Sequence, residues 1–266
     1  MRTAHVGQPR IPACLCRAAL ALAVLAVLFP AIDGVGYANE TRIGLHGGLN
    51  IPSISGGGNE QSEGYSSRLG PYFGVFADYV MRPDFSLRGE INYASQGGKR
   101  NGMQAVSASQ LSGVPIPEGM TVYANFDNET ILDYVEIPVM AMMSWGRTTR
   151  FFVDAGPYVG FLVRARTVTS GSSLLYSDAS GTLPISGDIQ SFDANTDTKG
   201  DINSTSAGIA GGIGIETPFG PGGVCVAAHF SMGLTNIQKD TEANGKNRTG
   251  SVAVTIGYFY APQRER

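Results

Sequence analysis

The stretch "DYVEIPVMAMMSW", residues 133–145, decides the fold because it is apolar yet carries Glu136 and Pro138 near its middle. A proline would break a buried helix, and a membrane-spanning helix needs about 20 consecutive apolar residues. In a β-strand, alternate side chains point to opposite faces. Glu136 and Pro138 then share one face, while the other face is apolar and consists of Val135, Ile137, Val139, Ala141, Met143 and Trp145. We therefore interpret the stretch as one strand of a membrane barrel, with its apolar face toward lipid.

The same alternation recurs along the rest of the chain, and no amphipathic helical pattern of useful length interrupts it. In "FSLRGEINYAS", residues 85–95, one parity is mostly apolar and the other is polar or charged. The pattern predicts an all-β chain with eight strands, placed near residues 41–51, 70–81, 84–96, 131–145, 150–166, 204–217, 224–236 and 249–260.

The polar parity of these strands contains ionisable residues of both signs. An eight-stranded barrel has an interior just wide enough to be filled by side chains, where opposite charges can pair. We expect Glu136 to meet Arg88 or an arginine of the fifth strand, and Pro138 to cause a bulge or bend. The predicted lumenal polar network, to which we assign a structural role, consists of Asp78, Arg88, Glu90, Glu136, Asp154, Arg164, Arg166, Glu216 and His229.

The connections between the predicted strands alternate in length. Residues 82–84, 146–149 and 218–223 form short turns, whereas the connections near 52–69, 97–130, 167–203 and 237–248 are long and polar. Outer-membrane barrels have short periplasmic turns, longer external loops and aromatic girdles at the membrane interfaces. The pattern therefore predicts an eight-stranded antiparallel up-and-down transmembrane β-barrel. Its short-turn girdle would contain Tyr79, Phe85, Trp145, Phe151, Tyr258 and Tyr260.

Residues 1–38 have the features of a secretory signal peptide. Three arginines precede the apolar run "AALALAVLAVLF", residues 18–29, and "GYA", residues 36–38, provides small residues at a cleavage site. Cleavage would remove Cys14 and Cys16 and leave Cys225 without an intramolecular disulfide partner. We expect residues 39–260 to form the barrel and residues 261–266 a short tail, with the protein exported to the outer membrane.

The charge of the predicted mature chain is acidic. Removing three arginines and one aspartate with the signal peptide leaves 16 basic and 21 acidic residues. This balance lacks the basic character of a nucleic-acid-binding protein. We therefore expect no nucleic-acid partner.

Three segments resemble a known family: "LDYVEIPVM" at 132–140, "FFVDAGPYVGFLV" at 151–163 and "GIAGGIGIE" at 208–216. They look like the bacterial outer-membrane β-barrel domain family that includes PorT-like proteins, over essentially the whole mature chain. The resemblance implies an eight-stranded integral outer-membrane barrel. It also implies that some relatives function in secretion or gliding, while most have no known activity.

Motifs for cofactors, metals and catalysis are weak. "GGIGIE" at 211–216 lacks the helix that follows a dinucleotide-binding loop, and "DANTDTKGD" at 193–201 lacks the glycine position and terminal glutamate of a calcium loop. The mature histidines, His46 and His229, are both predicted to lie mid-strand and in the lumen, away from the outer rim where a surface active site would lie. We expect no cofactor, no metal and no enzymatic activity.

Several functions fit a barrel of this kind. The first is a monomeric structural or interaction barrel, embedded in outer-membrane lipid, that presents its loops to a surface ligand or a periplasmic partner. The second is a small-solute pore, for which the interior of eight strands leaves little room, or a secretion-associated, PorT-like component. A soluble lipocalin-like carrier is a third interpretation, and it requires the apolar parity to face inward.

Overall fold

The computed structural model describes residues 40–57, 64–106, 120–185, 187–241 and 245–261. The predicted signal peptide and most of the predicted tail lie outside the described residues. Within the described ranges, no helix is long and apolar enough to cross a membrane.

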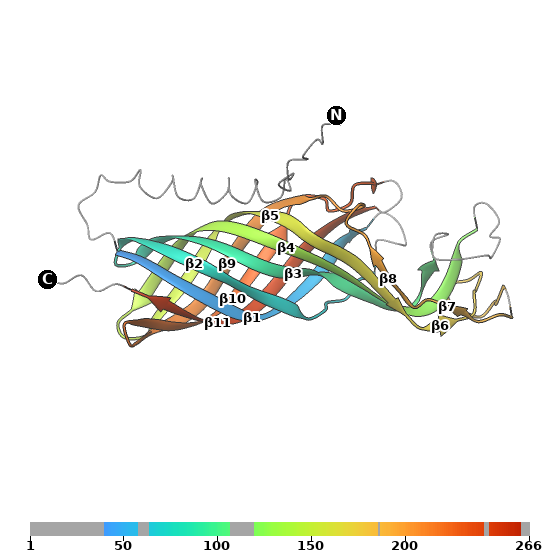
Figure 1. Cartoon of the computed structure of the whole chain (residues 1–266), viewed down its shortest axis with the longest axis horizontal. Helices are drawn as coiled ribbons and strands as arrows, with labels where there is room; N and C mark the ends of the chain where they lie inside the picture. Colours follow the sequence, from blue (N-terminus) through green and yellow to red (C-terminus); the bar gives the residue numbers. More distant parts are fainter. Residues whose placement is uncertain (1–39, 58–63, 107–119, 186, 242–244, 262–266) are drawn as a thin grey trace, which may run out of the picture. The chain divides into compact units, whose positions relative to one another are not determined.

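Eight long strands form one antiparallel sheet that closes on itself (Figure 1). Each strand pairs with its neighbour along the chain, and the pairing of the first strand with the last, for example Leu49 opposite Val254, closes the ring. The predicted all-β, eight-stranded up-and-down barrel is therefore confirmed. The strands are β1 (Glu40–Gly57), β2 (Gly70–Arg82), β3 (Phe85–Val106), β4 (Val122–Gly146), β5 (Arg150–Ser170), β9 (Thr205–Phe219), β10 (Gly222–Gly233) and β11 (Lys246–Tyr260).

The apolar parity of the strands faces outward. Large aliphatic side chains on three strands of the wall, β1, β9 and β11, are more than half exposed: Leu45 at 62%, Ile213 at 59% and Ile256 at 64%. In water this surface would be costly, because apolar area exposed to water is unfavourable at roughly 25 cal/mol per Å². Because a soluble lipocalin-like carrier requires the apolar side chains to face inward, their outward direction excludes that interpretation.

Aromatic side chains at the short-turn ends agree in part with the predicted girdle. Trp145 and Phe151 stack with a centroid separation of 6.4 Å, and both are exposed, as is Tyr260. Phe85 and Tyr258 are partly exposed, but Tyr79 is buried.

Two of the predicted long loops contain strands, which corrects their predicted bounds. The strands β3 and β4 continue as a paired hairpin from Gly98 opposite Thr130 to Val106 opposite Val122, so residues 97–130 are only in part a loop. The sequence signal is weak there because strands outside the lipid need no apolar outer face. The connection between β5 and β9 contains three short strands, β6 (Ser172–Ser173), β7 (Gln190–Ser191) and β8 (Ala194–Asp197).

The β4–β5 pair contains one register shift, and it does not lie at the proline. Asp133 is opposite Arg164, whereas Tyr134 is opposite Leu162, so Val163 is an extra residue in β5. The register is the same on both sides of Pro138, and the bulge expected there is absent.

Candidate functional site

The Arg88 guanidinium projects from β3 into the centre of the lumen, toward the end that carries the short turns. Its Nε donates to Asp78 Oδ1 at 2.6 Å, and its second terminal nitrogen donates to Asp78 Oδ2 at 3.0 Å. The remaining terminal nitrogen donates to Asp154 Oδ2 on β5 at 3.4 Å. Arginine suits this position because its planar donors match a carboxylate in a bidentate geometry. Arg88 on β3 thus joins β2 to β5, two strands that do not pair with each other.

A second arginine, Arg42 on β1, extends the network. It donates to Asp78 Oδ2 at 3.1 Å and to Glu216 Oε1 at 2.9 Å. Arg42 was not among the predicted network residues, although its parity on β1 is that of His46, which lies inside the barrel. Arg150 also approaches Glu216, with its Nε 3.7 Å from Oε1.

Aromatic rings pack against both arginines. The Arg88 guanidinium carbon lies 4.7 Å from the Phe76 ring centroid and 5.0 Å from that of Phe152, and the Arg42 carbon lies 4.8 Å from Phe259. Such cation–π contacts favour a desolvated cation. The Phe76 ring has room because Gly44 faces it, and a Cβ there would collide with the ring.

Seven of the predicted network residues lie inside the barrel with side chains at most 6% exposed. They are Asp78, Arg88, Glu90, Glu136, Asp154, Glu216 and His229.

The prediction was wrong for the two arginines of the fifth strand. Arg164 is exposed and Arg166 is only partly buried. The extra residue Val163 reverses the parity of β5, so that Leu162 faces the lumen below the bulge and Ala165 is buried above it. A bulge shifts every following side chain to the opposite face.

The expected ion pair of Glu136 with an arginine is absent from the described residues. Glu136 Oε1 instead accepts a hydrogen bond of 2.9 Å from Gln96 Nε2. The same amide nitrogen lies 3.4 Å from Ser231 Oγ and 3.3 Å from Ser251 Oγ. Glu136 therefore belongs to a hydrogen-bonded layer of amide and hydroxyl groups rather than to the arginine network.

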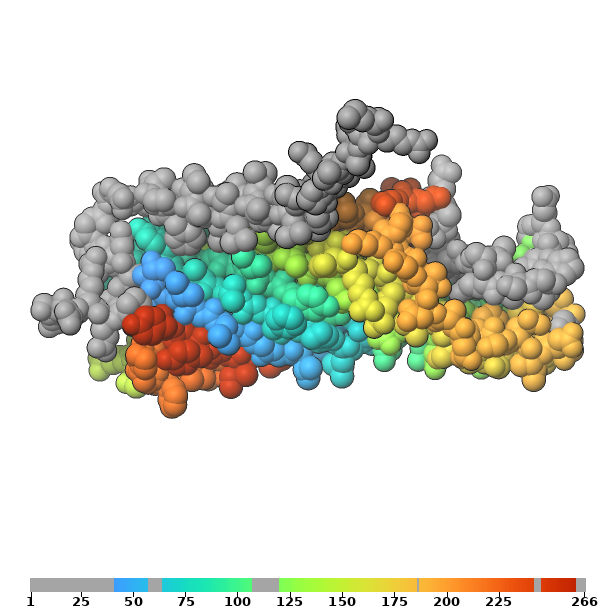
Figure 2. Space-filling model, viewed as in Figure 1, coloured from blue at the N-terminus to red at the C-terminus, as the bar shows by residue number. Residues whose placement is uncertain are grey.

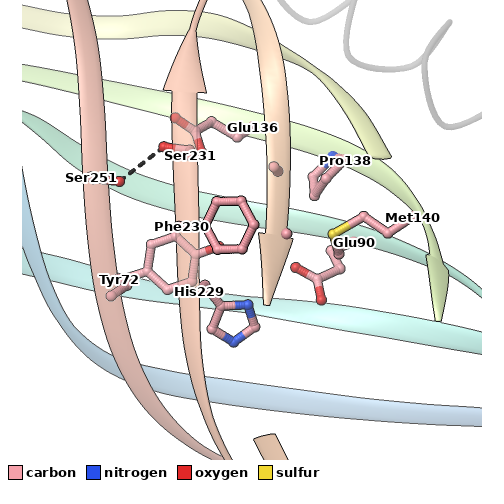
Figure 3. Close-up of a pocket in the computed structure, with 12 residues that line it drawn as sticks. Tyr72, Glu90, Glu136, Pro138, Met140, His229, Phe230, Ser231 and Ser251 are labelled. Atoms are coloured by element: carbon pink, nitrogen blue, oxygen red, sulfur yellow. Dashed lines mark hydrogen bonds between the residues drawn. The ribbon is translucent and has the colours of Figure 1, made fainter. Parts of the chain in front are cut away.

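The two histidines lie between these layers. Their ring centroids are 5.1 Å apart; His46 Nε2 is 2.9 Å from Asn92 Oδ1, and His229 Nε2 is 3.0 Å from Thr255 Oγ1. Beside His229 is a cavity of about 10 Å³ (Figure 3), room for about one water molecule. Its lining includes Tyr72, Glu90, Glu136, His229, Ser231 and Ser251.

The lumen toward the long connections is filled by apolar side chains. Leu132 and Tyr134 of β4 are at most 1% exposed, and they cluster with residues from the connections that follow β8 and β10. The described interior is therefore occupied by charged pairs at one end and by an apolar cluster at the other. The apolar cluster consists of Leu132, Tyr134, Leu162, Ala165, Ile202 and Ile237.

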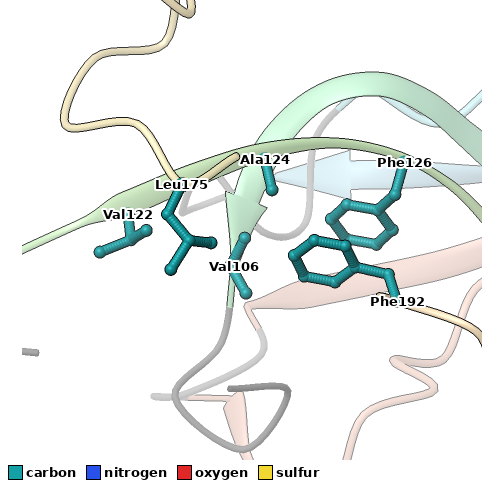
Figure 4. Packing of buried hydrophobic residues seen from close by; sticks show 6 residues of the cluster. All are labelled: Val106, Val122, Ala124, Phe126, Leu175 and Phe192. Atoms are coloured by element: carbon teal, nitrogen blue, oxygen red, sulfur yellow. The ribbon is translucent and has the colours of Figure 1, made fainter. Parts of the chain in front are cut away.

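Beyond the barrel, the hairpin extension of β3 and β4 has a small core of its own (Figure 4). Phe126 stacks on Phe192 with centroids 4.5 Å apart, so the β5–β9 connection packs against the hairpin. Tyr123 and Tyr176 exchange two backbone hydrogen bonds of 2.8 Å. We call this unit, residues 98–106, 120–130, 171–185 and 187–193, the extension. Its core consists of Val106, Val122, Ala124, Phe126, Leu175 and Phe192.

Comparison with known proteins gives one family match and several structural matches. The model of the outer membrane protein beta-barrel domain family matches residues 34–239. The attachment invasion locus protein of Yersinia pestis, Ail, has 12% sequence identity and a TM-score of 0.36, over 84% of this chain and 100% of that chain. Neisserial surface protein A has 12% sequence identity and a TM-score of 0.33, over 81% of this chain and 95% of that chain. The N-terminal β-barrel domain of Pseudomonas aeruginosa OprF has 8% sequence identity and a TM-score of 0.31, over 82% of this chain and 97% of that chain. No curated protein matches the chain.

Proposed function

We propose that this chain, which belongs to the outer membrane protein β-barrel domain family, anchors a recognition surface, the extension, to the cell exterior. The protein resides in the outer membrane. The observation that carries the proposal is the contrast between a filled lumen and a structured extension outside it.

The filled lumen favours an anchor over a pore. Arg88 and its carboxylate partners occupy the cross-section near the short turns, and Leu132 and Tyr134 occupy it near the long connections. Opening a path would require breaking buried ion pairs, each costing about 3–5 kcal/mol when one partner is removed. The interior is therefore suited to rigidity rather than to passage of solutes.

The extension points away from the end that carries the short turns (Figure 1). Since barrels of this class have short turns in the periplasm, the extension would lie at the cell surface. Its paired arms from Gly98 opposite Thr130 to Val106 opposite Val122 would reach roughly 30 Å at 3.3 Å per residue. That length is enough to carry its tip beyond the lipid headgroups.

The tip of the extension exposes apolar side chains on an ordered loop. Leu183 is 60% exposed and Ile189 is 70% exposed. Asp178 holds this loop by accepting hydrogen bonds from the backbone N–H groups of Thr182, at 3.1 Å, and Leu183, at 2.7 Å. Exposed apolar groups on a rigid support are typical of protein-interaction surfaces. We propose a protein partner for this tip.

An epitope inserted next to Asp188 tests the orientation on intact cells. An antibody should bind without permeabilisation, and the same epitope placed in the short turn at Arg147 should be bound only after permeabilisation. The reverse pattern would refute the proposed surface role.

Photocrosslinking tests the proposed partner. A photoreactive residue at Leu183 should give a discrete protein adduct on intact cells, whereas one at the lipid-facing Ile213 should not. Protein adducts of equal yield from both positions, or from Ile213 alone, would contradict recognition by the tip.

A further inference from the structure

The outward parity of the barrel wall changes from apolar to polar at one level toward the long connections. On β5 this change is exposed, because Val163, which is 43% exposed, is followed by the exposed Arg164. On β3 and β4 the same change, from Tyr93 to Ser95 and from Val135 to Asp133, is covered, since Ser95 accepts a hydrogen bond from Arg68 Nη1 at 3.0 Å and donates to Asp133 at 2.7 Å. This level marks the end of the lipid-facing band, where the headgroups of the bilayer lie.

Positive side chains from three chain segments meet at this level. The bulge that follows the Asp133–Arg164 pair exposes Arg164 on the outer wall, next to Val163. Lys199 Nζ donates to the Val163 carbonyl oxygen at 2.6 Å, and Lys239 Nζ donates to the Gly200 carbonyl oxygen at 2.5 Å. The segments around Lys199 (orange) and Lys239 (red-orange) lie along the upper edge in Figure 2. We call Arg164, Lys199 and Lys239 the rim cluster.

The cations of the rim cluster form no ion pair with a described residue. Unlike Arg42 and Arg88, the three cations have no carboxylate within 4.0 Å among the described residues. The backbone carbonyls that accept from the two lysines fix each ammonium in place. An ammonium has three donors and a guanidinium has five, so most of their donors remain available.

Two acidic groups near the rim cluster have hydrogen-bond partners other than its charged groups. Asp197 Oδ1 accepts from the Lys199 backbone N–H at 2.9 Å, and buried Asp133 accepts from Ser95 Oγ at 2.7 Å. Asp201 and Asp240 are exposed in the same two segments. Two further cations lie on neighbouring parts of the strands, partly buried Arg166 on β5 and exposed Arg248 on β11.

We propose that the rim cluster binds the phosphate groups of the phosphorylated glycolipid in the outer leaflet. Lysine and arginine at the headgroup level contribute about 1 kcal/mol each to binding an anionic lipid surface, a fivefold change in affinity. Directly below the cluster, exposed Val159 and Val163 of β5 offer apolar surface on which acyl chains can lie. A lipid satisfies both features at once, whereas a soluble anion would use only the cations. This proposal rests on the proposed orientation.

Native mass spectrometry of the refolded protein in a neutral detergent tests the proposal. The probes are bis-phosphorylated lipid A, lipid A without its phosphates, and inorganic phosphate. The unaltered protein should bind the phosphorylated form, and the triple variant Arg164→Gln, Lys199→Gln, Lys239→Gln should bind it about 100-fold more weakly. The matched control is Arg147→Gln, an exposed cation in the short turn at the other end, which should bind as the unaltered protein does.

Three results would overturn the proposal. These are unchanged affinity in the triple variant, equal affinity for dephosphorylated lipid A, and binding of inorganic phosphate with the same affinity as the lipid. Heat-modifiable migration on gels verifies that each variant is folded, and Arg164→Lys should retain most of the binding. Lipid binding in detergent does not depend on the orientation of the barrel in the membrane. Loss of lipid binding would therefore leave the proposed surface role of the extension intact, whereas an epitope hidden on intact cells would refute the orientation alone.

Discussion

Replacing Arg88 by Met should be among the most destabilising changes in the barrel. Arg88 is 3% exposed and donates to Asp78 at 2.6 and 3.0 Å and to Asp154 at 3.4 Å. Methionine fills similar volume but leaves Asp154 without a cation and Asp78 with only Arg42. Removing one partner of a buried ion pair costs about 3–5 kcal/mol, so we expect a loss of about 4 kcal/mol in the free energy of unfolding.

Glu136→Gln is the control, because Glu136 is also a buried ionisable residue, 5% exposed, but its partner is Gln96 and it has no arginine partner among the described residues. Its hydrogen bond from Gln96 Nε2 at 2.9 Å can be made to a glutamine oxygen as well. Replacing a hydrogen-bonded group by one that keeps the bond should change the free energy of unfolding by about 1 kcal/mol or less.

The assay is urea unfolding of the refolded barrel in lipid vesicles, with the slope of the transition verified to be equal among variants. A double variant with Asp78→Asn measures the coupling of Asp78 to Arg88, which should be clearly different from zero. If Arg88→Met and Glu136→Gln cost the same, the lumen is not held by the arginine network and the reasoning from these contacts is wrong.

Three further predictions concern the outer wall, the lumen and the tip of the extension. Ile213→Arg should cost about 2–4 kcal/mol in vesicles, since the side chain faces lipid, and Ile213→Leu should be nearly neutral; a tolerated arginine would place this face away from lipid. The thiol of Cys225 is 6% exposed and should react with a charged thiol reagent only in urea; rapid labelling of the folded protein would indicate an open lumen. The hydrogen bond from Ser180, with those from Thr182 and Leu183, lowers the pKa of Asp178. The Asp178 carboxylate should therefore hold the loop fully above about pH 4, the pKa of a free aspartate. The loop should be released only as the pH falls through the lower pKa that Asp178 has in the folded protein. Loss of amide protection at Leu183 already near pH 4, or protection unchanged in Asp178→Asn, would contradict this role.

The eight strands could be predicted because lipid requires an apolar side chain at every second position. The alternation of residues such as Val135 and Ile137 therefore predicts which face of the strand contacts lipid. The same parity places Asp78 and Glu216 inside, although it does not say which arginine they meet. Arg42 was recognisable by its parity on β1 and was missed because Gly44 and Gly48, which follow on the same face, carry no charge.

The remaining features depend on contacts between distant segments. The exposed position of Arg164 results from one extra residue opposite Asp133, and pairing between strands decides whether that residue is accommodated. The extension could not be recognised because its strands have water on their outer face, so no regular alternation is required. Its core forms only when Phe192, from the next connection, packs on Phe126.

Conductance of the refolded protein in a planar lipid bilayer tests the central claim, that the lumen is filled and the barrel functions as an anchor. The unaltered protein should insert without producing discrete current steps, and smaller probes such as sodium and chloride should pass no better than larger ions. Reproducible, long-lived current steps from the unaltered protein, absent from protein-free bilayers, would show that the lumen is an open pore and would contradict the account.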